Sequence, residues 1–163
     1  GLHLSKSVLH DRTYRGPRSP EQAAVRQARS SGAFIDDANQ PVDNAYLEQD
    51  LVETLARWAP YCQRHGMLLF EAHTAAPGLI QENLHRNWSP GFDIIQGLSR
   101  QYPMELDVLH DALREAGYII ESWSDPTQGF CGFATMSMNW LKHSALKPII
   151  SAKVEKTIAR PAD

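Results

Sequence analysis

Residues 46–73 read YLEQDLVETLARWAPYCQRHGMLLFEAH, a stretch with helical periodicity followed by a short apolar run. Its apolar side chains recur at spacings of four, four and three, which places them on one helix face: Leu47, Leu51, Leu55 and Trp58. Asp43 or Asn44 can cap the start, because a short side-chain oxygen accepts a hydrogen bond from an unpaired backbone N–H. The pair His65-Gly66 ends the helix, since glycine tolerates the left-handed conformation common at helix termini.

The apolar run after this helix, Met67 to Phe70, is predicted to be a strand buried on both faces. A second unit repeats the order of helix, glycine and strand. Pro103 is expected in the first turn of its helix, Gly117 ends that helix, and Tyr118 opens the next strand. The apolar face of this helix is formed by Leu106, Leu109 and Leu113. Two such units predict an α/β fold.

Two further strands are expected towards the ends of the chain. Residues 2–9 (LHLSKSVL) form an apolar-rich run predicted to be a strand, although its length alone does not separate strand from helix. Residues 130–138 are predicted to return antiparallel to the strand that opens at Tyr118, as a pair at the sheet edge. The pattern weakens from His143, so we expect a domain over residues 1–142 and a tail or linker over residues 143–163. The chain starts inside a strand-like run without an initiator Met, so we expect the carboxyl-terminal part of a larger domain.

Composition and charge exclude several classes of protein. Hydrophobic residues make up 42% and charged residues 21%, which is ordinary globular usage and excludes a disordered or fibrous chain. A net charge of -3 provides no basic footprint, so no nucleic-acid partner is expected. There is no apolar stretch of about 18 residues and no signal-peptide pattern, so we expect no membrane association and a cytoplasmic location. Cys62 and Cys131 are too few and too far apart for a disulfide framework or a thiolate zinc site.

Two polar clusters follow predicted strands: His10-Asp11 after the first run and Glu71-x-His73 after the second. In open α/β sheets, ligands bind beyond the carboxyl ends of the strands. If the two strands are neighbours, His10 and Glu71 can meet. A carboxylate bonded to one imidazole nitrogen fixes the tautomer and raises the basicity of the other nitrogen, as a general base requires.

Two other interpretations of these residues stay open. Taken one at a time, a His or Glu at a strand end is an ordinary solvated or capping side chain. Taken together, His10, Asp11, Glu71 and His73 offer nitrogen and oxygen donors suited to iron, manganese or zinc, although the chain has no compact motif such as His-Glu-x-x-His. His110, on the second helix, is expected at the surface.

Four stretches of the chain resemble the methyltransferase domains of polyketide synthases, most closely the apratoxin-like type. They are SKSVLHDRTY (5–14), YLEQDLVETLARWAPYCQRHG (46–66), LLFEAHT (68–74) and LSRQYPMELDVLHDALREAGY (98–118), and the likeness covers most of residues 3–123. The resemblance implies a Rossmann-like class I methyltransferase sheet, of which this chain would be the carboxyl-terminal half with strands four to seven and their helices. It also implies that His10 deprotonates the substrate with Glu71 as its partner. Asp11 and His73 would support this site or hold a mononuclear iron or manganese.

The resemblance further implies methyl transfer from S-adenosylmethionine to an acyl chain on the phosphopantetheine arm of an acyl carrier protein, on carbon or oxygen, beside neighbouring synthase domains. In that family the glycine-rich cofactor loop belongs to the first three strands, and this chain contains no Gly-x-Gly-x-Gly. No cofactor-binding residue is therefore predicted here, and the chain alone is expected to be inactive. The missing loop also supports a second hypothesis, a degenerate half-domain that serves only as a docking or structural module.

Overall fold

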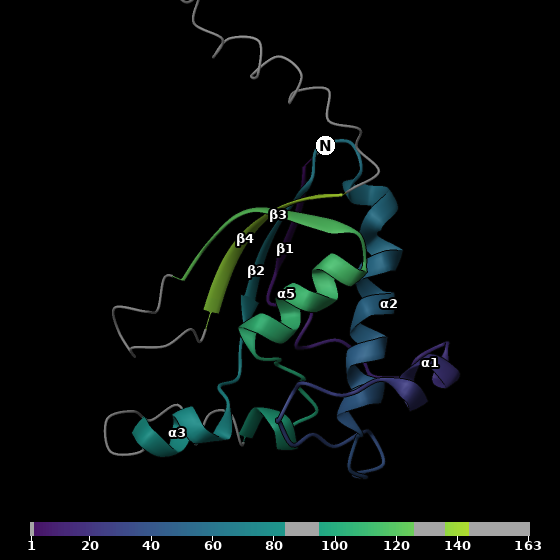
Figure 1. The fold of residues 1–163 in the computed structure, drawn as a ribbon, viewed down its shortest axis with the longest axis vertical. Coiled ribbons are helices and arrows are strands. Elements are labelled where there is room, and N and C mark those ends of the chain that lie inside the picture. Colours follow the sequence, from purple (N-terminus) through teal and green to yellow (C-terminus); the bar gives the residue numbers. More distant parts are fainter. Residues whose placement is uncertain (1, 84–94, 126–135, 144–163) are drawn as a thin grey trace, which may run out of the picture.

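The computed structural model describes residues 2–83, 95–125 and 136–143, which form a mixed α/β arrangement (Figure 1). The elements are β1 (His3–Lys6), α1 (Pro20–Val25), α2 (Asn44–Cys62), β2 (Met67–Ala72), α3 (Pro77–Asn83), α5 (Leu106–Glu115), β3 (Tyr118–Ser124) and β4 (Met136–His143). The strands form a four-stranded sheet in the order β1-β2-β4-β3. β1 and β2 are parallel, whereas β4 is antiparallel to both of its neighbours. The predicted α/β class is confirmed.

Helix α2 forms where its sequence predicts, but it ends before the predicted stop at His65-Gly66. The side chain of Asp43 caps it by accepting a hydrogen bond from the backbone N–H of Ala45 at 2.8 Å. The helix ends at Cys62, and the chain then turns at Gly66, whose φ is 78°. A Cβ atom at Gly66 would collide with the carbonyl oxygen of Leu141 in β4. Glycine is therefore required there both by the left-handed backbone and by the close approach of two strands.

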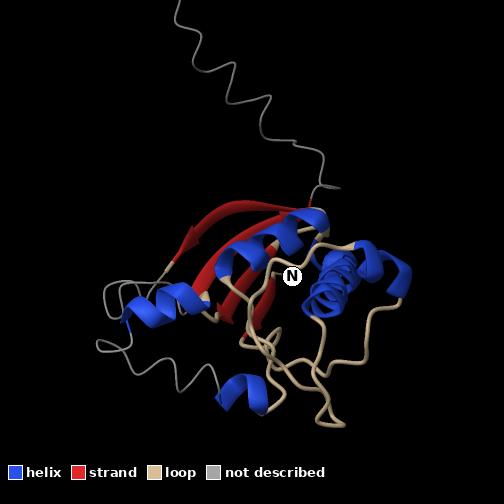
Figure 2. Cartoon of the chain, turned by 60° about the horizontal axis from the view of Figure 1, so that its bottom comes forward, coloured by secondary structure: helices blue, strands red, loops and turns tan. Residues whose placement is uncertain are grey.

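Helices α2 and α5 lie on the same face of the sheet, as both views show (Figures 1 and 2). The core fills this interface with side chains from both helices and from the strands: Leu47, Leu51, Leu55, Met67, Leu69, Leu109, Leu113 and Leu141. On the opposite face, Leu68 and Phe70 of β2 are only half-buried. The prediction that this strand is buried on both faces is wrong for the described residues, because alternate side chains of a strand point to opposite faces and the core lies on one of them.

The first run forms the strand β1, but the apolar side chains at the start of the run do not face the core. Leu2 and Leu4 are 53% and 64% exposed, whereas Ser5 is buried. Ser5 pairs in register with Leu69, which faces the helices, so Leu4 must face the other side. Beyond the strand, Ser7 adopts a left-handed φ of 54°, and Leu9 is the first apolar side chain of the run to reach the core.

The last strand pairs antiparallel with β3, as predicted, but it begins only at Met136. Residues 130–135 of the predicted strand lie outside the described residues. β4 lies inside the described sheet, between β2 and β3, so of this predicted edge pair only β3 is an edge strand. Pro103 precedes α5 and does not belong to its first turn, since Glu105 holds the N-cap position.

The predicted division into residues 1–142 and 143–163 stays a prediction. His143 is the last residue of β4, and residues 144–163 lie outside the described residues. In the parts of the chain that the structure describes, no helix has the length and apolar character needed to cross a bilayer.

Candidate active site

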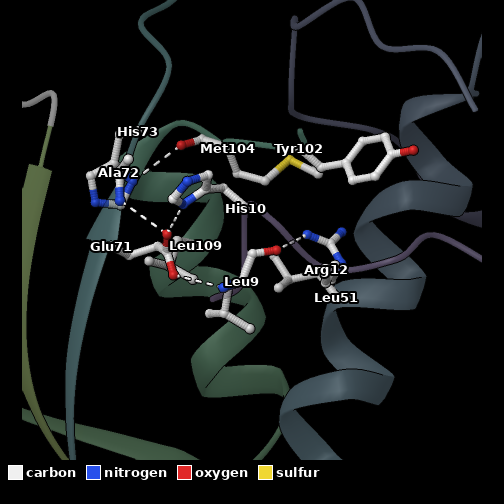
Figure 3. A pocket seen from close by; sticks show the side chains of 10 residues that line it. All are labelled: Leu9, His10, Arg12, Leu51, Glu71, Ala72, His73, Tyr102, Met104 and Leu109. Atoms are coloured by element: carbon white, nitrogen blue, oxygen red, sulfur yellow. Dashed lines mark hydrogen bonds and ion pairs between the residues drawn. The ribbon is translucent and has the colours of Figure 1, made fainter. Parts of the chain in front are cut away.

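The carboxyl ends of β1 and β2 bring the two predicted residues together (Figure 3). The strands are parallel neighbours, so both chains emerge at the same edge of the sheet. His10 follows β1, and Glu71 lies within β2, one residue before its end. The Nδ1 atom of His10 and the Oε1 atom of Glu71 form a short hydrogen-bonded pair. Both residues are buried, with exposed fractions of 8% and 3%, so the predicted meeting of the two side chains is confirmed.

The carboxylate of Glu71 is fixed by backbone donors as well. Its Oε2 atom accepts a hydrogen bond from the N–H of Leu9 at 2.9 Å, and its Oε1 atom accepts one from the N–H of Ala72 at 3.1 Å. An ionised carboxylate only accepts hydrogen bonds, so Nδ1 of His10 carries the proton. The lone pair of the imidazole then lies on Nε2, which has no hydrogen-bond partner within the described part of the chain. The arrangement has the form of a general base with an orienting carboxylate.

The turn that carries His10 is held by Arg12, a residue to which the sequence analysis gave no role. Its guanidinium donates to the carboxylate of Asp50 at 2.9 Å and to the carbonyl oxygens of Leu9 and Leu47 at 2.8 and 3.2 Å. Burial lowers the pKa of Arg12 from its ordinary value, and the charge of Asp50 opposes that shift. The only sequence signal for Arg12 was its position directly after the first polar cluster, His10-Asp11.

His73 is buried beside the pair, but both of its ring nitrogens are already engaged. Nδ1 lies 3.1 Å from the carbonyl oxygen of Met104, and Nε2 lies 2.6 Å from Oγ of Ser137. A carbonyl only accepts, so Nδ1 carries the proton and Nε2 accepts from the hydroxyl of Ser137. Burial lowers the pKa of His73 to about 4, so the ring is neutral at pH 7.

Asp11 does not join the site. It is exposed, and its carboxylate accepts a long hydrogen bond of 3.5 Å from the side chain of Gln101. The one lone pair of neutral His73 is occupied by Ser137. Among the described residues, no group of three or more His, Cys, Asp or Glu side chains is arranged to hold a metal ion. These residues therefore do not fit an iron or manganese centre, and Asp11 and His73 are not placed as its ligands.

His110 is buried, contrary to the expectation that it lies at the surface. Its Nε2 atom donates to Oδ1 of Asn139 at 2.8 Å, and Nδ2 of Asn139 donates to Oγ of Ser137 at 2.7 Å. Burial lowers the pKa of His110 from its ordinary value. Ser137 and Asn139 alternate with Met138 and Trp140 along β4, a pattern that by itself favours the larger apolar side chains as the buried set. The sequence pattern therefore did not predict that His110, Ser137 and Asn139 are buried together.

The ten residues labelled in Figure 3 line a pocket of about 10 Å³, and His10 and Glu71 are two of them. This volume has room for about one water molecule. Its wall combines the polar groups of His10, Glu71 and His73 with apolar side chains from the helices and from the segment before α5, such as Leu51 and Met104. Because His10 and Glu71 are both buried, the electrostatic interaction between them is stronger than it would be in water.

The buried, neutral state of His73 predicts a pH dependence of stability. Unfolded His73 binds a proton below pH 6.5, whereas folded His73 does so only below about 4. Its contribution to the free energy of unfolding is therefore complete above pH 6.5 and is lost as the pH falls from 6.5 to about 4, by roughly 3 kcal/mol. Urea unfolding at several pH values should show a flatter dependence in His73→Asn than in the wild type.

The matched control for this prediction is His65→Asn, because His65 is exposed. Its pH dependence should follow that of the wild type. Equal slopes for the wild type and His73→Asn would contradict a neutral, buried His73.

Comparisons with known proteins place the chain in a family. Among solved structures, the chain is similar to the mitomycin 7-O-methyltransferase MmcR, with 14% sequence identity and a TM-score of 0.43. That match covers 87% of this chain and 29% of the MmcR chain, so the chain spans less than a third of that enzyme's length. No curated protein sequence matches the chain. A family model described as the AprA MT2-like domain matches residues 1–137. The chain therefore belongs to the AprA MT2-like family of methyltransferase domains.

Proposed function

We propose that the protein containing this chain transfers a methyl group from S-adenosylmethionine to an acyl chain on the phosphopantetheine arm of an acyl carrier protein. Family membership supports the methyl transfer. The carrier-bound acyl substrate, and contacts with neighbouring synthase domains, follow from the resemblance to polyketide-synthase domains. The observation that carries the proposal is the buried His10–Glu71 pair at the ends of adjacent parallel strands.

In this proposal His10 is the general base. Glu71 holds Nδ1–H, and Nε2 takes the proton from the acceptor C–H or O–H as the acceptor attacks the methyl group. The imidazolium formed is stabilised by Glu71, whose second oxygen stays bonded to the N–H of Leu9. When S-adenosylmethionine is bound, the methyl group on its positively charged sulfur would be the electrophile, and the electrons of the broken S–CH3 bond would stay on sulfur, leaving neutral S-adenosylhomocysteine. Alignment of donor and acceptor supplies much of the remaining rate.

In this mechanism no residue of this chain is given the role of binding S-adenosylmethionine or a metal. The sequence has no Gly-x-Gly-x-Gly, so binding of S-adenosylmethionine is assigned to no residue here. The side chains near the pair do not fit a metal centre. We infer that the chain supplies the acceptor side of the active site, as the carboxyl-terminal half of a class I methyltransferase domain would.

The direct test is a methyl-transfer assay of the protein that contains this chain. The substrates are S-adenosylmethionine with an isotopically labelled methyl group and an acyl carrier protein loaded with a β-ketoacyl chain. We expect the label on the carrier-bound acyl chain, and tandem mass spectrometry distinguishes methylation on carbon from methylation on oxygen. A protein that binds S-adenosylmethionine but leaves the acyl chain unlabelled would contradict the proposed substrate class.

A docking module without catalysis is the second candidate. It is supported by the exposed Leu4 of β1 and the exposed Leu2 and Val8 on either side of this strand, which among the described strands pairs with β2 alone. This candidate predicts stable binding to a neighbouring synthase domain and no methyl transfer. Retention of that binding by Leu4→Lys, or methyl transfer lost in His10→Ala, would contradict it.

A further inference from the structure

A chain of hydrogen bonds runs through the buried space between α5 and the sheet. The side chain of His110 on α5 donates to Asn139, which donates to Ser137, and the hydroxyl of Ser137 donates to His73. The three distances are 2.8, 2.7 and 2.6 Å. Ser137 and Asn139 are fully buried, and His73 is 3% exposed. Buried polar groups are costly unless they are hydrogen-bonded. In this network each side chain donates to the next, from His110 to His73.

The series of hydrogen bonds continues from His73 to the backbone of His10, the candidate base. Nδ1–H of His73 donates to the carbonyl oxygen of Met104 at 3.1 Å. Two residues earlier in the same segment, the N–H of Tyr102 donates to the carbonyl oxygen of His10 at 2.6 Å. Pro103 lies between them with a fully buried side chain, and its ring restricts the backbone. The segment 102–104 is thus a short, stiff connection between His73 and His10.

We propose that His73 is a positioning residue for the His10–Glu71 pair, oriented by Ser137 and acting on His10 through the Met104 carbonyl and the Tyr102 N–H. The catalytic importance of this inference rests on the proposed function. The connection itself does not, because it is a property of the hydrogen bonds. The N–H of Thr74 also donates to the Met104 carbonyl, at 3.3 Å, so loss of His73 is expected to loosen the connection and not to abolish it.

Two substitutions separate the two hydrogen bonds of His73. The amide nitrogen of Asn is attached to Cγ, as Nδ1 of His is, so His73→Asn retains the donor to Met104 and loses the acceptor for Ser137. The amide of Gln is one atom further out, at the position of Nε2, so His73→Gln retains the contact with Ser137 and loses the donor to Met104. If His73 acts through Met104, His73→Gln must disturb His10 more than His73→Asn does.

The measurement is the rate at which diethyl pyrocarbonate modifies His10 in the full chain, followed by peptide mass spectrometry. The reagent acylates an unprotonated imidazole nitrogen, here Nε2, and access is restricted because the His10 side chain is only 10% exposed. Loosening of the turn should raise this rate. We expect an increase of about threefold to thirtyfold in His73→Gln, the range produced by changes along coupled networks, and less than about twofold in His73→Asn. The exposed His65 provides an internal reference rate.

His110→Asn is the matched control. This substitution breaks the same series of buried hydrogen bonds at the end away from His10. It should lower the melting temperature and leave the rate at which diethyl pyrocarbonate modifies His10 unchanged. Ser137→Ala is the second test variant, because it removes the hydroxyl that orients His73. We expect it to raise the rate at His10 by less than His73→Gln and by more than His110→Asn.

An unchanged rate at His10 in folded His73→Gln would overturn the inference, as would equal increases in His73→Gln, His73→Asn and His110→Asn. If His73→Gln does not fold, an unchanged rate in Ser137→Ala overturns it. Failure of the proposed function has a different signature, unimpaired methyl transfer by His10→Ala, and would leave the reactivity comparison unaffected.

Discussion

His10→Ala is expected to lower the rate of methyl transfer by about 10²–10⁴-fold in the protein that contains this chain, the usual contribution of a positioned general base. The substitution removes Nε2, the atom that takes the proton, and leaves Glu71 with its two backbone donors. The measurement is single-turnover transfer to an acyl chain on its carrier protein. The affinity for S-adenosylmethionine should barely change, because His10 lies on the acceptor side in the proposed arrangement.

Glu71→Gln should cost less than His10→Ala, because the amide keeps the shape and a hydrogen bond and loses only the charge that stabilises the imidazolium. The double variant should be little worse than His10→Ala alone, since groups that act through one proton are not additive. Asp11→Asn is the matched control, because Asp11 is adjacent in sequence and exposed. Near-normal turnover by His10→Ala would refute the base assignment.

Asp50→Ala is expected to lower the free energy of unfolding by about 3–5 kcal/mol, the cost of leaving a buried charge without its partner. The side chains of Arg12 and Asp50 are each only 8% exposed, and the guanidinium also holds the carbonyl oxygens of Leu9 and Leu47. Without Asp50, burial of the cation is no longer compensated. Urea unfolding followed by circular dichroism measures the loss.

Two further variants make this prediction specific. Glu121→Ala breaks the ion pair with Lys142, in which both side chains are more than a third exposed, and should cost no more than about 1 kcal/mol. The double variant Arg12→Met with Asp50→Leu removes both charges and should recover much of the loss seen in Asp50→Ala. A loss below about 1 kcal/mol in Asp50→Ala would contradict a desolvated ion pair.

Several elements were predictable because their signals are local. The leucine spacing of residues 47–55 and the cap at Asp43 define α2, and each depends on neighbours within a few residues. The contact between His10 and Glu71 was predictable on one condition, that β1 and β2 are adjacent and parallel. General rules for α/β sheets supplied the rest, since ligand-binding side chains collect beyond the carboxyl ends of such strands.

The burial of individual strand residues was not predictable in the same way. Leu4 is exposed and Ser5 buried in β1, while Ser137 and Asn139 are buried in β4 beside half-buried Met138. Periodicity says which residues share a face of a strand, but it does not say which face the helices cover. That choice is made by α2 and α5, which are distant in sequence from these strands.

The neighbours Asp11 and Arg12 show the same limit at the site. Both are charged and both follow His10, yet Asp11 is exposed and Arg12 is buried against Asp50, which lies on α2. The sequence alone therefore established the α/β class, the long helix and the candidate base with its carboxylate, because these follow from short-range periodicity and strand-end rules. The tertiary structure alone established the role of Arg12 and the path from His110 to His73, because these depend on contacts between residues far apart in the chain.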